Sequence, residues 1–150
     1  MREEVYDYLH DYGFSAIELD KIEKTNENMF FTDVSEVRKN ITFLEEKLLD
    51  NEDVLDIINK NPFMLTEKNN RLEQLDNIYL KELVLNDDDL INLLLNNPEV
   101  YTVNPIELTK IINYLKSKNY NTEVIKELIF QNSKIISMKF EDFEKAIRFN

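Results

Sequence analysis

Lysine residues recur at one position of a periodic pattern, where they could bind a charged partner. A column of equivalent positions, separated by 35 or 36 residues, contains Lys39, Gln74, Lys110 and Lys145. If these side chains share a concave face, three ammonium groups would contact phosphates or a partner's carboxylates at a regular pitch. We predict this column as the candidate binding stripe, with ordinary solvated lysines as the alternative. Lys24 and Lys60 form a weaker second column with the same alternative.

Groups that could support catalysis or hold a metal are sparse. The chain has no cysteine, and its one histidine, His10, has no HExxH partner. The acid clusters at 50–56 and 86–89 lack the glycine and the twelfth-position glutamate of an EF-hand loop. They also coincide with predicted helix starts. We therefore predict no catalytic residue, no metal, no cofactor and no small-molecule substrate.

The charge balance bears on the class of partner. Eighteen basic and thirty acidic residues give a net charge of −12, which counts against a large face for duplex nucleic acid, although a local basic stripe can coexist with acidic flanks. No apolar run approaches the roughly 20 residues that cross a membrane. The opening residues "MREEVYDYLHDYGF" have no apolar signal-peptide centre. We expect a soluble cytoplasmic protein without a membrane partner.

The composition indicates the fold class. A chain of 150 residues with one glycine, three prolines, 43% hydrophobic and 32% charged residues has little material for sheet turns or glycine-rich loops. Its length is typical of one domain with a substantial core. We predict a single all-α domain over residues 1–150.

The chain repeats itself. An aromatic residue followed by leucine recurs at spacings of 35, 36 and 35 residues, at Tyr8, Phe43, Tyr79 and Tyr114. Other columns keep this register, among them Ile22, Ile57, Leu93 and Leu128, then Val37, Leu72, Leu108 and Phe143. One extra residue between Leu72 and Tyr79 explains the spacing of 36. This pattern predicts a solenoid of four repeats, near 8–42, 43–78, 79–113 and 114–150.

Each repeat reads as a long helix followed closely by a second helix. Leu108, Ile111, Ile112 and Leu115 have the spacing of one helical face. The second helix follows a residue whose side chain can cap its first turn, at Ser15, Asp50, Asn86 and Asn121. Ser15 and Glu18 have the spacing of a capping box.

Two prolines mark where the second helix ends. Pro62 and Pro98 occupy the same frame, after Asn61 and Asn97, and proline disfavours helix at the residue before it. The next residues, "FML" and "EVY", are too few for a full helix and too apolar for an exposed loop, so we predict a short buried 3-10 turn. A closing helix follows near 140–149.

At these residues the chain resembles the mitochondrial transcription termination factor (mTERF) repeat family. The stretches that carry the resemblance are "YLHDYGFS" (8–15), "NKNPFML" (59–65) and "LNNPEVY" (95–101). The resemblance implies a left-handed superhelix of three-helix repeats and, in the well-known members, binding of duplex nucleic acid during gene expression. Glu27 and Ser133 depart from it, because they stand where the middle repeats have proline.

Two functions therefore stay open for a non-enzymatic helical-repeat protein. It binds duplex nucleic acid through the lysine column and regulates transcription or a related process, or it is an acidic protein-binding adaptor or inhibitor that does not bind nucleic acid. The closing helix leaves a similar choice. Its apolar positions Phe140, Phe143 and Ile147 have no following repeat, so its polar residues cap the stack, or an apolar edge is left for a partner or a second copy.

Overall fold

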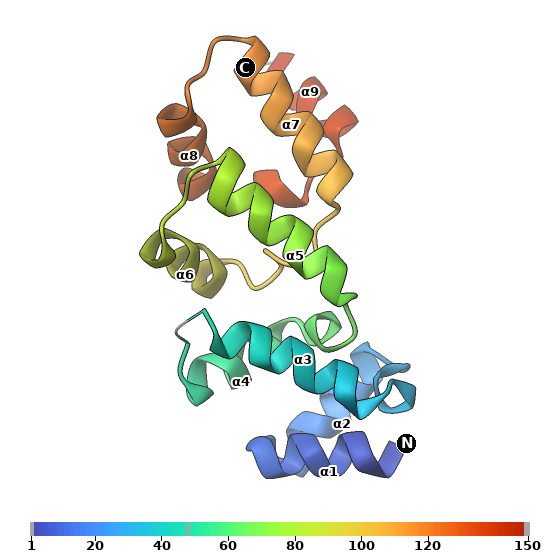
Figure 1. Cartoon of the computed structure of the whole chain (residues 1–150). Helices are drawn as coiled ribbons and strands as arrows, with labels where there is room; N and C mark the ends of the chain where they lie inside the picture. The colour runs from blue at the N-terminus through green and yellow to red at the C-terminus, as the bar shows by residue number, and fades with distance from the viewer. Residues whose placement is uncertain (1, 48, 149–150) are drawn as a thin grey trace. The chain divides into compact units, whose positions relative to one another are not determined.

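The computed structural model describes residues 2–47 and 49–148, and every regular element within these ranges is helical. The predicted all-α class is thus confirmed (Figure 1). The chain forms two compact units, Met1–Asn69 and Asn70–Asn150, which are described separately below. The number of repeats, their superhelical arrangement and the single domain stay predictions.

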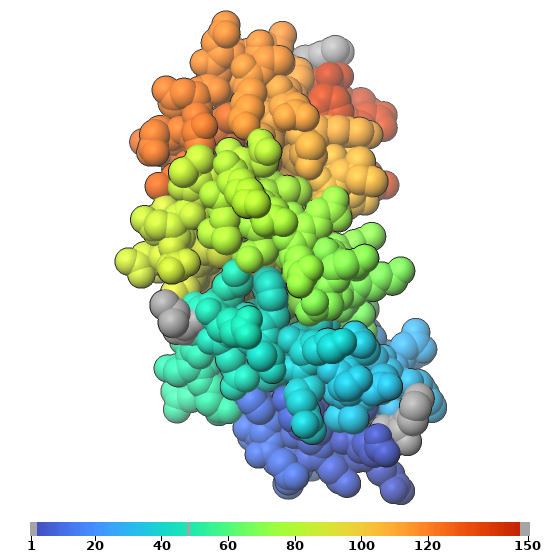
Figure 2. Space-filling view, viewed as in Figure 1, coloured from blue at the N-terminus to red at the C-terminus, as the bar shows by residue number. Residues whose placement is uncertain are grey.

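The N-terminal unit contains two successions of helix, helix and short 3-10 turn. Its elements are α1 (Arg2–Tyr12), α2 (Ala16–Thr25), η1 (Met29–Phe31), α3 (Val34–Glu45), α4 (Asn51–Lys60) and η2 (Pro62–Leu65). The short turn of each succession packs against its own first helix, η1 on α1 and η2 on α3, and α1 also contacts α3. In the space-filling view, α1 in dark blue and α3 in cyan form neighbouring layers of this unit's surface (Figure 2).

The C-terminal unit follows the same order with two local differences. Its elements are α5 (Asn69–Asn77), the π-helical turn η3 (Ile78–Glu82), α6 (Asp87–Asn96), α7 (Pro105–Ser117), α8 (Thr122–Gln131), η4 (Ser133–Ser137) and α9 (Phe140–Arg148). A π turn therefore extends the first helix. After α6, residues 98–102 form turns without a regular 3-10 helix, so the predicted 3-10 turn is wrong at this place.

The second helices begin where the capping pattern predicted. Ser15, Asp50, Asn86 and Asn121 are the N-cap residues of α2, α4, α6 and α8, and each side chain accepts a hydrogen bond from the amide three residues later. The capping box of Ser15 and Glu18 is confirmed. Asn86 and Asp89 form a second box that the sequence analysis did not predict. These contacts satisfy amides that the helix itself leaves without partners.

The second helices end at an asparagine in a non-helical conformation. Asn26, Asn61, Asn97 and Asn132 are the C-cap residues, with φ between −144° and −125° and ψ between 80° and 93°. The Asn26 side-chain amide donates to the carbonyl of Pro62 (3.3 Å), and that of Asn97 donates to the carbonyl of Ser133 (3.1 Å). Each reaches 36 positions ahead, so a helix end in one succession is bonded to the short turn of the next. We call this contact the amide clamp.

The repeat columns supply the core. Val37, Leu72, Leu108 and Phe143 are all buried, and so are Phe30, Leu65, Tyr101 and Ile136. Some columns change character along the chain. Tyr79 is fully buried, whereas its counterpart Tyr8 is half-buried. In another column, Tyr120 is exposed, whereas its counterparts Phe14, Leu49 and Leu85 are buried. The periodic apolar residues are thus mostly, but not uniformly, removed from water.

The extra residue between Leu72 and Tyr79 has a structural counterpart. The backbone amide of Leu83 donates to the carbonyl of Ile78, five residues earlier, at 3.1 Å. A single residue inserted into an α-helix produces such a π turn, because one turn must hold one residue more. The insertion inferred from the spacing is accommodated within η3.

Three of the first helices, α1, the helix formed by α5 and η3, and α7, are followed by a residue with positive φ. This residue is Gly13 (φ 137°), Val84 (φ 53°) and Asn119 (φ 68°), at matching repeat positions. Glycine tolerates such a backbone and asparagine adopts it with modest strain, but a β-branched side chain is strained there. Val84 is also 62% exposed, so little packing offsets the strain.

Replacing Val84 by glycine should therefore stabilise the protein. Left-handed backbone costs about 1–2 kcal/mol for a non-glycine residue, and glycine returns part of this through its larger unfolded-state entropy. We expect a net gain of about 1 kcal/mol, or about 2–4 °C in Tm, measured by thermal and urea unfolding. Asn119→Gly is the matched control, with an effect within about 0.5 kcal/mol. Equal effects at both positions would refute strain at Val84.

Substitutions in the amide clamp should lower the free energy of unfolding. Asn97 is 9% exposed, donates to Ser133 and accepts from the Glu99 amide at 3.1 Å. Asn97→Ala should cost about 1–3 kcal/mol because it leaves buried partners unsatisfied. Asn97→Asp should cost more at neutral pH, since a carboxylate would then face the Ser133 carbonyl.

The exposed counterpart of Asn97 provides the control. Asn132 is the C-cap of α8 and is exposed, so Asn132→Asp should change the free energy of unfolding by less than about 0.5 kcal/mol. Urea unfolding of the three variants measures the difference. If Asn97→Asp is as mild as Asn132→Asp, the clamp does not contribute to stability.

Candidate binding surface

The lysine column is exposed on the first helices. Lys39 lies on α3, Gln74 on α5, Lys110 on α7 and Lys145 on α9, and all four residues are exposed. Lys39 belongs to the N-terminal unit, and the other three belong to the C-terminal unit. A continuous stripe over both units stays a prediction.

Each lysine of the column is paired with a carboxylate on its own helix. Lys39, Lys110 and Lys145 lie 3.4 Å from an oxygen of Glu36, Glu107 and Glu141, respectively. Lys24 and Lys60 pair in the same way, with Asp20 at 3.1 Å and Asp56 at 2.9 Å, but the 35-residue register relates Lys24 to Asn59, so these two lysines do not form a repeat column. Exposed pairs of this kind contribute about 0–1 kcal/mol. A phosphate can therefore displace the carboxylate, but the neighbouring negative charge weakens its attraction.

Glu107 makes the most constrained of these pairs. One of its carboxylate oxygens accepts the backbone amide of Phe140 at 3.2 Å, and the other contacts Lys110. Its side chain is 22% exposed, against 50% for Glu36 and 79% for Glu141. Glu107 thus joins the start of α9 to α7 and holds the Lys110 ammonium close to that junction.

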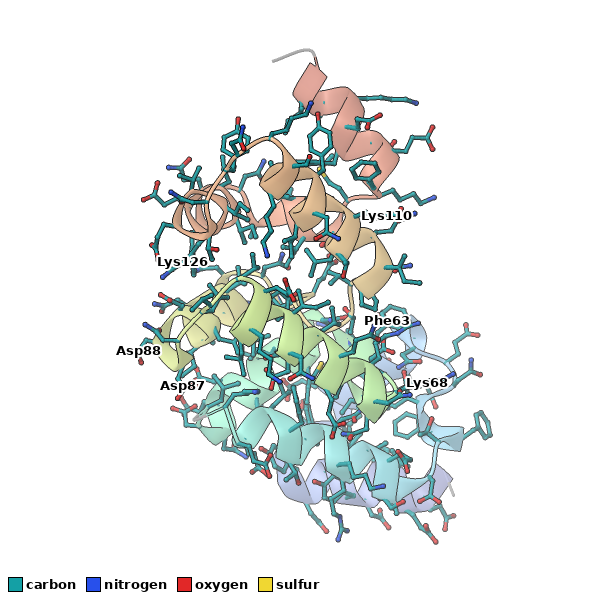
Figure 3. All side chains as sticks on the ribbon, turned by 45° about the horizontal axis from the view of Figure 1, so that its top comes forward. Phe63, Lys68, Asp87, Asp88, Lys110 and Lys126 are labelled. Carbon is teal, nitrogen blue, oxygen red and sulfur yellow. The ribbon has the colours of Figure 1, made fainter. Side chains whose placement is uncertain are left out.

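A less exposed ion pair lies outside the residues predicted from the sequence. Lys126 on α8 lies 2.9 Å from Asp89 at the start of α6, and the two side chains are 23% and 22% exposed. The hydrogen bond from the ammonium lowers the pKa of Asp89, and the same contact raises the pKa of Lys126. Figure 3 shows Lys126 and Lys110 on opposite sides of the unit. Lys126 had no basic counterparts at its repeat position, so no column indicated it.

A similar contact links the second helices of the N-terminal unit. The side-chain amide of Asn59 on α4 donates to Glu18, the acid of the capping box at the start of α2. Hydrogen bonds from the Ser15 backbone, and then from side chains, lower the pKa of Glu18. In both units an acid that caps one second helix thus also binds a donor on the next one.

Two buried tyrosines in the C-terminal unit have structural contacts. The Tyr79 hydroxyl donates to the carbonyl of Val100, and the Tyr101 hydroxyl donates to Asp76 at 2.7 Å. Their rings meet edge to face at 5.7 Å. Burial raises the pKa of both hydroxyls, so they stay protonated and act as hydrogen-bond donors.

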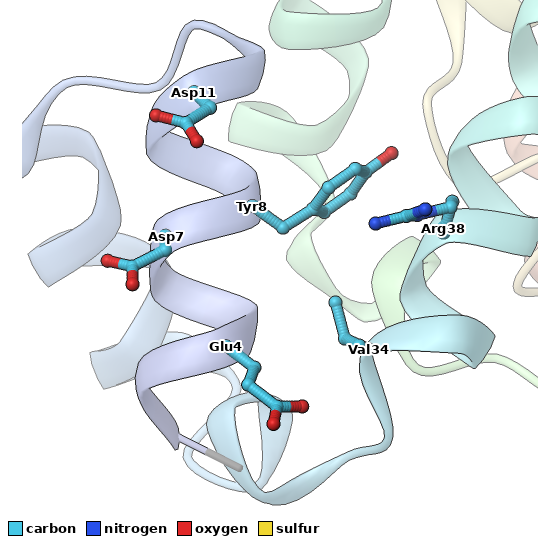
Figure 4. A pocket seen from close by; sticks show the side chains of 6 residues that line it. All are labelled: Glu4, Asp7, Tyr8, Asp11, Val34 and Arg38. Carbon is cyan, nitrogen blue, oxygen red and sulfur yellow. The ribbon is translucent and has the colours of Figure 1, made fainter.

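The N-terminal unit contains an open groove of about 410 Å³ between α1 and α3. It is lined by Glu4, Asp7, Tyr8, Asp11, Val34 and Arg38. The Arg38 guanidinium lies 4.9 Å from the centre of the Tyr8 ring, a cation–π contact that joins the two helices (Figure 4). No sequence pattern indicates this groove, because its two walls come from helices that meet only in the fold.

The other residues considered for chemistry have ordinary surroundings. His10 is exposed on α1 and stacks against Tyr6 at a centroid distance of 6.1 Å. Over the described part of the chain, no group of three or more histidine, aspartate or glutamate side chains could hold a metal ion. Asp50 and Asp89 of the acid clusters take part in helix capping.

The closing helix α9 turns its apolar side toward α7. Phe143 is buried, and Phe140 and Phe143 meet the Tyr114 ring edge on at 5.7 and 6.1 Å. Glu141 and Asp142 are exposed. This packing favours a polar cap over an apolar edge. Arg148 is another polar residue of this helix, and its side chain lies outside the described structure.

Comparisons with known proteins agree with this architecture. Among the described residues, no helix is long and apolar enough to span a membrane. No curated protein matches the sequence. The family model mTERF matches residues 31–150, a range that includes both asparagine–proline stretches and begins after "YLHDYGFS". The predicted resemblance is confirmed, and the chain belongs to the mTERF family.

Proposed function

We propose that this chain is a non-enzymatic helical-repeat protein that binds duplex nucleic acid and regulates transcription or a related process. The observation that carries the proposal is the family match over residues 31–150, because the resemblance implies this function. The exposed Lys39, Lys110 and Lys145 support it as phosphate contacts.

The ion pairs of the column shape how such binding would work. A phosphate that reaches Lys39, Lys110 or Lys145 must displace a carboxylate 3.4 Å away. Part of the electrostatic attraction is then cancelled by the displaced acid. Binding through the column should therefore be weak and should depend steeply on salt.

A titration with duplex DNA and RNA at low and physiological salt tests the proposal. Three phosphate contacts predict that log K falls with log salt at a slope of about −2.7. The variant Lys39→Glu, Lys110→Glu, Lys145→Glu should abolish the binding. Lys24→Glu, Lys60→Glu, Lys118→Glu changes the net charge equally and should retain most of it. Equal loss in both variants would move the site away from the column.

Removing the competing carboxylates should have the opposite effect. Glu36→Gln, Glu107→Gln, Glu141→Gln frees the three ammonium groups, and a glutamine oxygen at position 107 can still accept from the Phe140 amide. Affinity should rise about tenfold if each freed lysine regains a fraction of a kcal/mol. Glu27→Gln, Glu46→Gln, Glu52→Gln is the control of equal charge. An equal rise in both would show that only net charge matters.

A second function is favoured by a specific observation. Every lysine of the column has an acid beside it, in a chain of net charge −12. That arrangement suits an acidic adaptor or inhibitor that binds a protein and repels nucleic acid. Absence of nucleic-acid binding even at low salt would exclude the first function and leave this one.

A further inference from the structure

Charge is balanced along most helices of this protein by one rule. An acid is followed three or four residues later by a lysine that pairs with it, on α2, α3, α4, α7 and α9. Such neighbours stabilise a helix and cancel each other's charge. These five helices therefore carry little net charge along the paired face.

Helix α1 breaks this rule. Its exposed acids Glu4, Asp7 and Asp11 follow one another at intervals of three and four residues, so acid faces acid. None of them forms an ion pair with a side chain in the described ranges. Like charges at this spacing destabilise a helix, and Asp11 also lies in the last turn, at the negative end of the helix dipole. Glu4 lies in the first turn, where the helix dipole favours an acid, so the unfavourable contributions fall on Asp7 and Asp11.

The position of the stripe reverses the sign of the lysine column. The 35-residue spacing that relates Tyr8 to Phe43 also relates Glu4 to Lys39. A glutamate on α1 thus stands where three of the four later first helices carry a lysine. Helix α1 lies outside residues 31–150, the range that the family model matches.

The three acids border the groove between α1 and α3. Figure 4 shows the Tyr8 ring and the Arg38 guanidinium pointing toward each other across the groove, with Glu4 and Val34 below them. Three carboxylates against one guanidinium leave the lining negative. A volume of about 410 Å³ lies near the lower end of the range for ligand pockets, which suits one or two long side chains of a larger partner.

We propose that this groove docks a lysine- or arginine-bearing segment of a partner protein. Its cationic groups would lie against Glu4, Asp7 and Asp11, and its aliphatic stems would pack on Tyr8 and Val34, as long basic side chains do on partly apolar surfaces. Nucleic acid does not fit this site, because the carboxylates repel phosphates and Arg38 is already held against Tyr8. The groove is therefore a protein site separate from the lysine column.

Binding of a labelled amphipathic peptide of lysine and leucine, measured by fluorescence anisotropy, tests this proposal. The variant Glu4→Gln, Asp7→Asn, Asp11→Asn should weaken binding about tenfold, the effect of three modest charge contacts. It should fold, since the changes remove repulsion within α1, and circular dichroism checks this. The same peptide with glutamate for lysine should not bind.

The control is the variant Glu27→Gln, Glu46→Gln, Glu52→Gln, whose replaced acids are exposed in the same unit and away from the groove lining. It removes the same charge and should change the affinity less than about twofold. Nuclear magnetic resonance shifts on adding the peptide should concentrate on α1 and the start of α3. Equal weakening in both variants, or shifts spread over other helices, would overturn the proposal, and so would tighter binding of duplex DNA than of the peptide at this groove.

Discussion

The fold depends on how a helix can stop inside a packed stack. Each second helix ends in an asparagine with a non-helical backbone conformation, and the peptide groups that follow are buried with the short turn. Buried polar groups need partners, and the side-chain amides of Asn26 and Asn97 provide them across successive repeats. Asn40 serves the same short turn from α3, because its amide lies within 2.7–3.3 Å of the carbonyls of Met64, Leu65 and Glu67. These amides thus give carbonyls of the buried short turns hydrogen-bond donors inside the stack.

The periodicity predicted the helices well, because both the apolar spacing and the capping residues are local signals. The starts of α2, α4, α6 and α8 agree with it to the residue. The roles of the asparagines could not be predicted from the sequence. Asn97 was expected to mark a helix end beside a proline, but its bond to Ser133 is a tertiary contact. Asn40 looked like an ordinary polar residue, and its burial at 2% exposure follows only from the packing of η2 on α3.

For the candidate surfaces too, local patterns were predictable from the sequence and tertiary contacts were not. The lysine column was visible as a sequence pattern, but the role of the acids three or four residues before its members was not predicted. Their effect on the column becomes clear only when the 3.4 Å pairs are seen. The groove beside Tyr8 and Arg38 could not be found from the sequence, since its walls come from α1 and α3, two helices that meet only in the fold. Acids and lysines thus pair along five helices, whereas the acids Glu4, Asp7 and Asp11 on α1 have no such lysine partner among the described residues.

The π turn at Ile78–Glu82 shows where a repeat of this chain can change its length by one residue. The extra residue is accommodated within this one π-helical turn, and Tyr79 and Leu83 remain buried. An insertion or deletion of one residue at this site therefore disturbs the structure little, and the repeat positions that follow it keep their relation to one another. If the repeats were aligned at a constant spacing of 35 residues, equivalent positions would be mismatched after this turn, although the order of helices before and after it is the same.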